Sequence, residues 1–258
     1  MSHCVVIPTY NNASTLVEVV AQVFAVCANV IVVNDGSTDS TSQLLQSFPV
    51  PDQCRFWVVE YSKNRGKGYA LKCGFSKAKA EGFDCAVTID ADGQHYAADI
   101  CRLVDAYRLC GVSRAMVVGS RDLAADGMPA QNSFANRFSN FWFRLQTGVS
   151  LPDTQTGFRL YSLRHLPCMG LLTNRYESEL ELLVFSSWNG VKMISCPVRV
   201  YYPPAAERVS HFRPFWDFFR ISVLNTILTL IAPFACIRRW IIEKSRPLEP
   251  EPPRTLEF

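Results

Sequence analysis

Two acidic side chains, Asp90 and Asp92, stand two residues apart where an apolar run gives way to polar residues. The preceding residues read as a buried strand, and Gly93 and Gln94 follow. Two carboxylates this close repel each other unless a cation lies between them or one holds a proton. Hard oxygen ligands favour Mg²⁺ or Mn²⁺, which usually complete their coordination with phosphate oxygens and water. A D-x-D pair can also be a solvated turn. The prediction of a metal site therefore depends on the position of this pair at the end of a buried strand.

A basic loop, residues 63–68 (KNRGKG), combines three cations with two glycines ahead of a helix-like pattern. Glycines permit close backbone approach, and cations such as Lys67 can neutralise a diphosphate. The loop has neither the Walker A nor the GxGxxG spacing. A plain polar loop is the alternative interpretation.

A second polar loop, residues 34–39 (NDGSTD), has two interpretations of equal weight. It can be a turn that caps the following helix. Alternatively, Asp35 can accept hydrogen bonds from a base or a ribose.

The elements that position these residues alternate between short apolar runs and longer helical patterns. Consecutive rather than alternating apolar residues are typical of strands buried on both faces of a parallel sheet. The expected strands are 4–8, 30–34, 55–60, 85–90 and 115–119, and the expected crossover helices are 15–28, 38–46, 69–81 and 97–109. This order predicts an α/β fold, an open and mostly parallel sheet with helices on both faces.

Polar residues follow nearly every expected strand, including Tyr10, Asp35, Asp90 and Arg121. In open parallel sheets, ligands bind outside the carboxyl ends of the strands, so these groups should converge on one crevice. Further along the chain the sequence predicts helices over 132–146 and 175–188 and a strand over 192–201. The predicted organisation is a catalytic domain over 1–204, an acceptor loop with membrane-associating helices over 205–241, and a disordered tail over 242–258.

Composition excludes several classes of protein. The chain has 258 residues, of which 48% are hydrophobic, and its net charge is +3. The cations are not clustered as in a nucleic-acid binder, so no nucleic-acid partner is expected. The ten cysteines are scattered without a CxxC pair, which favours buried reduced thiols. The N-terminus carries no signal-peptide pattern, and we expect the catalytic part in the cytosol.

A helix beginning at Pro214 is expected to associate with a membrane. It places Phe215, Trp216, Phe219 and Val223 on one face, and residues 221–237 contain no charge. Seventeen residues span only about 25 Å as a helix, short of the ~30 Å hydrocarbon core. A helix lying in the membrane surface is therefore preferred over a short spanning helix, and both over a core or dimer helix.

Taken together, these motifs resemble the inverting nucleotide-sugar glycosyltransferases of family 2, which have the GT-A fold. The matching stretches lie in order within roughly the first 160 residues: VVIPTYNN, IVVNDGSTD, NRGKGYALKCG, VTIDADGQH, VVGSR and DTQTGFRLY. The stretches IDADGQH and DTQTGFRLY look most like the dolichol-phosphate mannosyltransferase branch and its bacterial polyprenyl-phosphate relatives.

The resemblance implies roles for residues of this chain. The segment Asp90-Ala91-Asp92 would contact the donor, with Asp90 and Asp92 holding a metal and Gln94 assisting. The loops after the first two strands imply a nucleoside site. Its residues would be Pro8, Tyr10 and Asp35. Arg121 and Arg159 would bind phosphates of donor or acceptor, and a late acceptor loop would contain Ser210, His211 and Arg213.

The choice of acceptor depends on whether a base is needed. A sugar hydroxyl loses a proton as it attacks and so requires a positioned carboxylate. A polyprenyl phosphate is already anionic and needs cations instead. The candidate cations are Arg121, Arg159, Arg208 and Arg213. The candidate bases are Asp153, Glu177, Glu179 and Glu181.

The predicted function is therefore a metal-dependent inverting glycosyltransferase at the cytoplasmic face of the membrane, peripheral or monotopic. It would move a hexose from a nucleotide-diphosphate sugar, of the GDP-mannose or UDP-glucose type, to a polyprenyl or dolichyl phosphate. Transfer to a sugar or lipid hydroxyl is one alternative. An inactive nucleotide-sugar-binding membrane scaffold is another, and a nucleotidyltransferase is disfavoured because no early glycine-rich loop follows the first strand.

Overall fold

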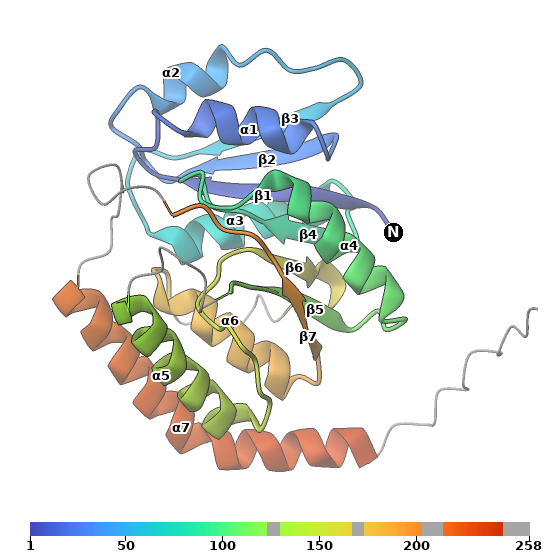
Figure 1. Ribbon diagram of the computed structural model, residues 1–258, viewed down its shortest axis with the longest axis vertical. Helices are drawn as coiled ribbons and strands as arrows, with labels where there is room; N and C mark the ends of the chain where they lie inside the picture. Colours follow the sequence, from blue (N-terminus) through green and yellow to red (C-terminus); the bar gives the residue numbers. More distant parts are fainter. Residues whose placement is uncertain (123–129, 167–172, 203–213, 245–258) are drawn as a thin grey trace, which may run out of the picture.

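The computed structural model describes the whole chain apart from residues 123–129, 167–172, 203–213 and 245–258. The predicted acceptor loop and most of the predicted tail, 242–258, therefore lie outside the described residues. The rest forms one seven-stranded sheet with helices packed on both faces (Figure 1). The predicted open, mostly parallel α/β architecture is confirmed.

The sheet has the strand order β3-β2-β1-β4-β6-β5-β7. Strands β1 to β4 are parallel, β6 is antiparallel to both of its neighbours, and β5 and β7 are parallel to each other. The strand bounds are His3–Thr9 (β1), Asn29–Asn34 (β2), Arg55–Glu60 (β3), Cys85–Thr88 (β4), Ala115–Ser120 (β5), Arg159–Ser162 (β6) and Lys192–Pro197 (β7).

Alternate side chains of the central strands build two separate cores. Val5 and Ile7 of β1 point to the core beneath α1, α2 and α4, whereas Cys4 and Val6 point to the core beneath α3 and α6. The helix bounds are Leu16–Phe24 (α1), Thr41–Gln46 (α2), Lys67–Ala80 (α3), Ile100–Leu109 (α4) and Glu177–Trp188 (α6). Strands buried on both sides explain the continuous apolar runs in the sequence.

Some predicted boundaries are wrong in detail. Strand β4 ends at Thr88, two residues before Asp90, and β7 ends at Pro197. Helix α1 is shorter than predicted at both ends, and strand β6 was not predicted. Because β4 ends early, Asp90 lies in the loop beyond the sheet rather than in its ladder, where its carboxylate can reach partners from other loops.

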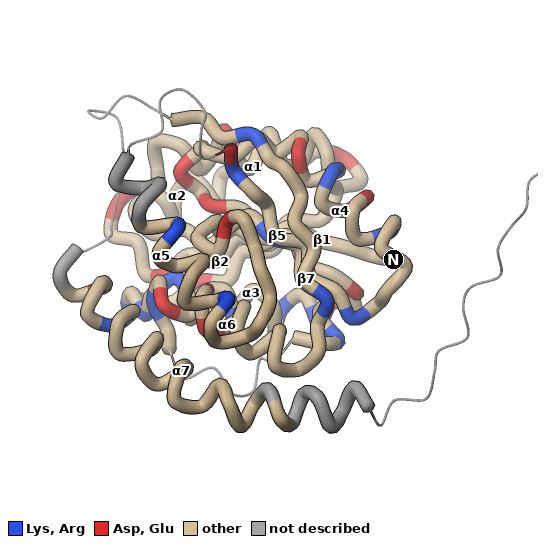
Figure 2. Tube along the Cα trace, turned by 60° about the horizontal axis from the view of Figure 1, so that its bottom comes forward, with Lys and Arg blue, Asp and Glu red and all other residues tan. Residues whose placement is uncertain are grey.

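Two further helices, α5 (Ala130–Thr147) and α7 (Pro214–Lys244), form an outer layer over α6. Helix α7 begins at Pro214 as predicted and changes direction in its second half (Figure 1). Pro233 lies within it, and a proline inside a helix removes a hydrogen bond and bends the axis. Asp217 and Arg220 lie near the beginning of α7, where Figure 2 shows charge, and no further charged residue follows before Arg238.

Helix α7 packs along the protein rather than away from it. Leu224 and Leu228 are buried, and Gln146 Nε2 of α5 donates to Asn225 Oδ1 at 3.0 Å. Its segment Trp216–Ala235 is long and apolar enough to cross a membrane. The opposite face exposes Trp216, Phe218, Leu230 and Phe234, among others.

Candidate functional site

The loops after β1, β2 and β4 are tied together by hydrogen bonds from short polar side chains. Asn11 N donates to Ser37 Oγ at 2.9 Å, and Thr38 N donates to Asn11 Oδ1 at 2.8 Å. The Thr15 hydroxyl at the start of α1 donates to the Ala91 carbonyl at 2.6 Å. The predicted convergence of strand-end loops is thus present, with Pro8 buried at the end of β1 and Tyr10 half-buried beyond it.

Asp35 fixes the basic loop. Its Oδ1 accepts from Arg65 N at 2.7 Å and its Oδ2 from Gly66 N at 2.8 Å. Gly36 (φ 67°) permits this closeness, since a Cβ there would lie 2.5 Å from Asn64 N. The buried Asp35 carboxylate therefore orders the loop that precedes Lys67. The nucleoside contact expected from the sequence stays a prediction.

Lys67, the first residue of α3, joins two carboxylates from distant parts of the chain. Its Nζ lies 2.7 Å from Asp90 Oδ1 and 3.0 Å from Glu179 Oε2. Gly157 closes over this cluster, because a Cβ there would lie 2.7 Å from Lys67 Nζ and 2.8 Å from Asp90 Oδ2. Thr88 Oγ1 donates to the Gly157 carbonyl at 2.6 Å and so holds that residue at the end of β4.

The two aspartates of the D-x-D pair have opposite electrostatic environments. Burial favours the neutral form of Asp90, but the Lys67 charge outweighs it and holds the pKa of Asp90 below its ordinary value. Burial, together with the Asp90 charge, raises the pKa of Asp92 to about 6. Asp92 Oδ1 also accepts from Gln94 N at 3.0 Å, which orients its carboxylate.

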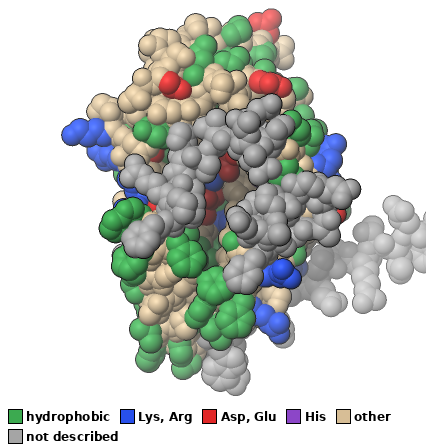
Figure 3. Space-filling view, turned by 60° about the vertical axis from the view of Figure 1, so that its left-hand side comes forward, with side chains coloured by type: hydrophobic (Ala, Val, Ile, Leu, Met, Phe, Trp, Pro, Cys, Tyr) green, Lys and Arg blue, Asp and Glu red, His purple; other side chains and the backbone are tan. Residues whose placement is uncertain are grey.

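This pair fits a divalent cation that is shared with a ligand. Burial first and the Asp90 charge second disfavour the ionised form of Asp92 and raise its pKa, and a cation between the carboxylates would offset both effects. Among the described residues, no group of three or more Asp, Glu, His or Cys side chains forms a metal cage of its own. Mg²⁺ and Mn²⁺ are commonly held by one or two carboxylates plus phosphate oxygens, so the donor set suits these ions. Acidic side chains lie on the floor of a surface hollow (Figure 3).

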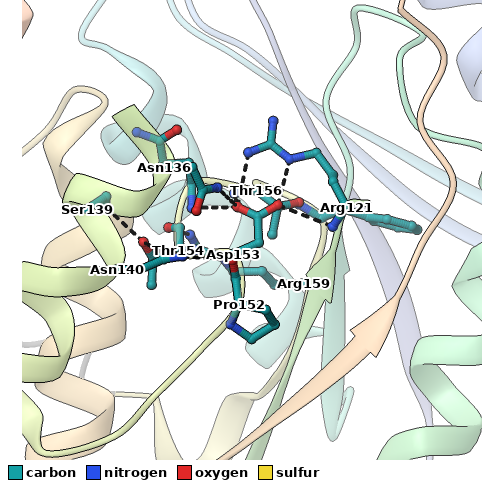
Figure 4. A network of polar contacts seen from close by, with 11 residues as sticks. Arg121, Asn136, Ser139, Asn140, Pro152, Asp153, Thr154, Thr156 and Arg159 are labelled. Atoms are coloured by element: carbon teal, nitrogen blue, oxygen red, sulfur yellow. Dashed lines mark hydrogen bonds and ion pairs between the residues drawn. The ribbon is translucent and has the colours of Figure 1, made fainter. Parts of the chain in front are cut away.

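Arg121 follows β5 and is clamped by Asp153. Its Nε donates to Asp153 Oδ2 at 2.6 Å and its Nη2 to Oδ1 at 3.0 Å, and Asn136 of α5 points its amide at the same carboxylate (Figure 4). Burial favours neutral Asp153, but the hydrogen bond and charge of Arg121 hold its pKa below the ordinary value. Asp153 is thus occupied as a partner of Arg121, which argues against its predicted role as a base.

Arg159 of β6 is fully buried, with 0% of its surface exposed. Its Nη1 donates to the Glu179 carbonyl at 2.9 Å and its Nη2 to the Thr154 carbonyl at 3.0 Å. These carbonyl contacts engage the guanidinium within the protein, and its predicted contact with a phosphate stays a prediction. Arg159 fixes the start of α6, and hence Glu179, relative to the sheet.

The remaining predicted residues are placed as follows. Glu177 is 6% exposed, and its Oε2 has no hydrogen-bond partner among the described residues. Glu181 Oε2 accepts from Thr173 N at 3.0 Å. Ser210, His211, Arg213 and Arg208 lie outside the described residues. Sequence reasoning missed the pairing of Lys67 with Glu179 and the closeness of Gly157, although Gly157 stands within the DTQTGFRLY stretch.

The chain is similar in sequence to known glycosyltransferases. The chain matches the model of Glycosyl transferase family 2 over residues 4–166. It is 27% identical over 202 residues to polyprenol monophosphomannose synthase of Mycolicibacterium smegmatis, covering 75% of each chain. It is 28% identical over 214 residues to the UDP-N-acetylglucosamine–dolichyl-phosphate N-acetylglucosaminyltransferase of Methanococcus voltae, covering 76% of this chain and 84% of the relative.

The fold also matches solved structures. Glucosyl-3-phosphoglycerate synthase from Mycobacterium tuberculosis, solved in complex with Mn²⁺, UDP and glucosyl-3-phosphoglycerate, superimposes with a TM-score of 0.61 at 19% identity. The match covers 91% of this chain and 80% of that one, and it confirms the expected GT-A architecture. Family match, fold and strand-end loops agree: the chain belongs to glycosyltransferase family 2 and is a glycosyltransferase.

Proposed function

We propose that the enzyme is a metal-dependent inverting glycosyltransferase. It moves a hexose from a nucleotide-diphosphate sugar to a polyprenyl phosphate at the cytoplasmic face of a membrane. The observation that carries the proposal is the Asp90–Asp92 pair. Asp90 is balanced by Lys67, and Asp92 carries a pKa raised to about 6 through burial and the neighbouring charge. This arrangement suits a cation that arrives with the donor's diphosphate.

The donor site is assigned to the loops beyond β1, β2, β3 and β4. Asp90 and Asp92, with Gln94, would hold Mg²⁺ or Mn²⁺, which would neutralise the departing nucleotide diphosphate. Pro8, Tyr10 and the Asp35 loop would border the nucleoside. Arg121, oriented by Asp153, provides a fixed cation for a phosphate group. The Mn²⁺ and UDP named with the mycobacterial structure support this choice of ligands.

Three of the four candidate bases are engaged by other residues, and this favours a phosphate acceptor. Asp153 is engaged by Arg121, Glu179 by Lys67, and Glu181 by Thr173. An anionic polyprenyl phosphate can attack the anomeric carbon without giving up a proton to a base. The names of the two relatives, a polyprenol monophosphomannose synthase and a dolichyl-phosphate transferase, support the same acceptor class.

A hydroxyl acceptor is the second candidate, and Glu177 favours it. Its buried Oε2 lacks a hydrogen-bond partner among the described residues. Glu179 Oε1 lacks one as well, but Glu179 is paired with Lys67 through Oε2, so Glu177 is the better candidate to take a proton. In that case Glu177→Gln would abolish transfer, whereas a phosphate acceptor predicts that it retains substantial activity.

The membrane assignment rests on the outer helices. Phe138, Phe141 and Leu145 of α5 and Trp216, Phe218, Leu230 and Phe234 of α7 are exposed large apolar side chains. Hydrophobic side chains gather on the part of the surface below the hollow (Figure 3). Exposed apolar patches of this kind mark membrane or protein contacts. A surface-bound helix would bring the site close to a lipid-borne phosphate.

The direct test uses the purified full chain in detergent with Mn²⁺. Melting temperatures are first measured with GDP-mannose, UDP-glucose and UDP-N-acetylglucosamine, since specific binding stabilises the folded state. The donor that raises the melting temperature is then supplied with either a polyprenyl phosphate or the matching polyprenol. Sugar transfer to the phosphate alone supports the proposal. Transfer to the polyprenol alone, with loss of activity in Glu177→Gln, would replace it with the second candidate.

A further inference from the structure

Helices α6 and α7 line a cavity of about 500 Å³, and Arg65 of the basic loop lies in its wall. The side chains that line it are charged in one part and apolar in another. Arg65, Arg175, Glu177 and Arg220 line one part, and Phe185, Val223, Ile227 and Ile231 line another.

The change follows the direction of both helices. On α6, Glu177 and Phe185 lie two helical turns apart on one face. On α7, Arg220, Val223, Ile227 and Ile231 follow at spacings of three and four, which also defines one face. Each helix therefore presents charge near its beginning and apolar side chains further along.

The two helices run in the same direction. Near their beginnings, Tyr176 interacts electrostatically with Asp217. Further along, Trp188 Nε1 donates to the Gln146 carbonyl at 2.8 Å, and the Gln146 side chain donates to Asn225. The charged ends of both helices thus lie together, and the cavity has one polar and one apolar end.

The polar end adjoins the donor site. A Cβ on Gly66 would lie 2.7 Å from Arg175 Cγ, and Gly66 immediately precedes Lys67, which binds Asp90. Arg65 is held in place because its Nη1 donates to Tyr69 Oη at 2.8 Å and its Cζ lies 4.7 Å from the Tyr69 ring centroid.

Charge at this end favours an anion with an apolar tail. Three guanidinium groups line this end together with Glu177 and Glu181, and Glu181 already accepts hydrogen bonds from Thr173. Arg220 Nη1 lies 3.6 Å from Oδ1 of the buried Asp217, whereas Arg65 and Arg175 form no ion pair with any described residue and remain for an anionic ligand. From Arg220 to Ile231 the apolar wall is about 17 Å long at 1.5 Å per helical residue, which accommodates several isoprene units.

We propose that the α6–α7 cavity is the binding groove for the acceptor, a prenyl phosphate. The phosphate lies against Arg65, Arg175 and Arg220, and the first isoprene units lie along Val223, Ile227 and Ile231. This inference rests on the proposed function and adds where the acceptor binds.

The kinetic test compares Ile227→Gln, in the groove, with Leu230→Gln, on the same helix but outside the cavity lining. Ile227 is 42% exposed and Leu230 71% exposed, so both variants should fold. With farnesyl phosphate, which needs no bilayer, Ile227→Gln and Arg175→Gln should each raise the acceptor KM about tenfold, the equivalent of ~1.4 kcal/mol. Leu230→Gln should leave it unchanged, and the donor KM should not change in any variant. Unchanged acceptor KM in both groove variants of an active enzyme would overturn the inference and leave the proposed function standing.

A binding test distinguishes failure of the groove inference from failure of the proposed transfer function. A benzophenone-bearing farnesyl phosphate is photolysed with the full chain in the absence of donor, and labelled peptides are mapped by mass spectrometry. Labels on α6 and the first half of α7, reduced by Ile227→Gln, support the groove even if no transfer is detected. Labels confined to other helices overturn it. Loss of self-association in Ile227→Gln, with unaltered labelling, would assign the groove to a second copy of the chain.

Discussion

Arg121 and Asp153 meet across 32 residues of sequence through two parallel hydrogen bonds, Nε to Oδ2 at 2.6 Å and Nη2 to Oδ1 at 3.0 Å. The Asp153 side chain is fully buried and that of Arg121 is 16% exposed. A bidentate pair of this kind fixes the guanidinium plane, so Arg121 is held in one orientation. Asp153 is accordingly a positioning residue.

Asp153→Asn should therefore destabilise the protein and impair activity together. Removing one partner of a buried ion pair leaves an uncompensated charge, which costs about 3 kcal/mol. Urea unfolding at neutral pH measures this loss. Asp105→Asn, in the exposed Asp105–Arg108 pair, is the control and should change stability by less than about 0.5 kcal/mol.

The Arg121–Asp153 pair also predicts how the stability of the protein changes in acid. The pKa of Asp153 lies below its ordinary value in the folded protein, so its contribution is present above the unfolded pKa. It is lost as the pH falls through the folded pKa. The stability gap between wild type and Asp153→Asn should therefore narrow in acid, and a constant gap would contradict the pairing.

Gly157→Ala tests the closeness of the Lys67 cluster. A Cβ there would approach Lys67 Nζ, Asp90 Oδ2 and Glu179 Oε1 within 2.7 to 3.0 Å, so the cluster must shift. We expect transfer activity to fall at least about tenfold, equivalent to ~1.4 kcal/mol in the barrier. Gly111→Ala, at a left-handed position after α4 with open space around it, should lose stability but retain activity per folded molecule. Full activity in Gly157→Ala would show that the Lys67–Asp90–Glu179 geometry is unimportant.

His95 predicts a further pH dependence of stability. Burial lowers its pKa to about 4, from about 6.5 in the unfolded chain. The unfolded state therefore binds the extra proton between these values, and stability falls as the pH drops from about 6.5 to 4, by roughly 3 kcal/mol in total. His95→Gln should flatten this part of a series of urea-unfolding curves. Parallel pH curves for the two proteins would contradict the assignment.

Much of the fold could be predicted because strand and helix patterns are local. Apolar runs such as those of β1 and β2 identify strands buried on both faces without knowledge of their neighbours. Strand β6 was missed because Arg159 begins it and is completely buried. That arginine is tolerated only because carbonyl groups of Thr154 and Glu179 receive its hydrogen bonds, and these contacts are not visible in sequence.

The site could be predicted as a set of residues but not as a set of partners. Asp90, Asp92, Asp35 and Arg121 follow strands whose ends must converge. Which carboxylate neutralises which cation depends on three-dimensional packing. The sequence therefore left Asp153 open as a base, whereas the fold brings it to Arg121, and it gave no sign that Glu179 meets Lys67.

The most direct test of the account is the metal dependence of sugar transfer to a polyprenyl phosphate by wild type and Asp92→Asn. The purified chain in detergent is given the stabilising nucleotide sugar with Mn²⁺ or with EDTA, and glycolipid is quantified. We predict product with Mn²⁺, none with EDTA, and a loss of at least about a hundredfold in Asp92→Asn with its melting temperature retained, equivalent to ~2.7 kcal/mol. Equal product with EDTA, or undiminished turnover in Asp92→Asn, would contradict the role given to the acidic pair.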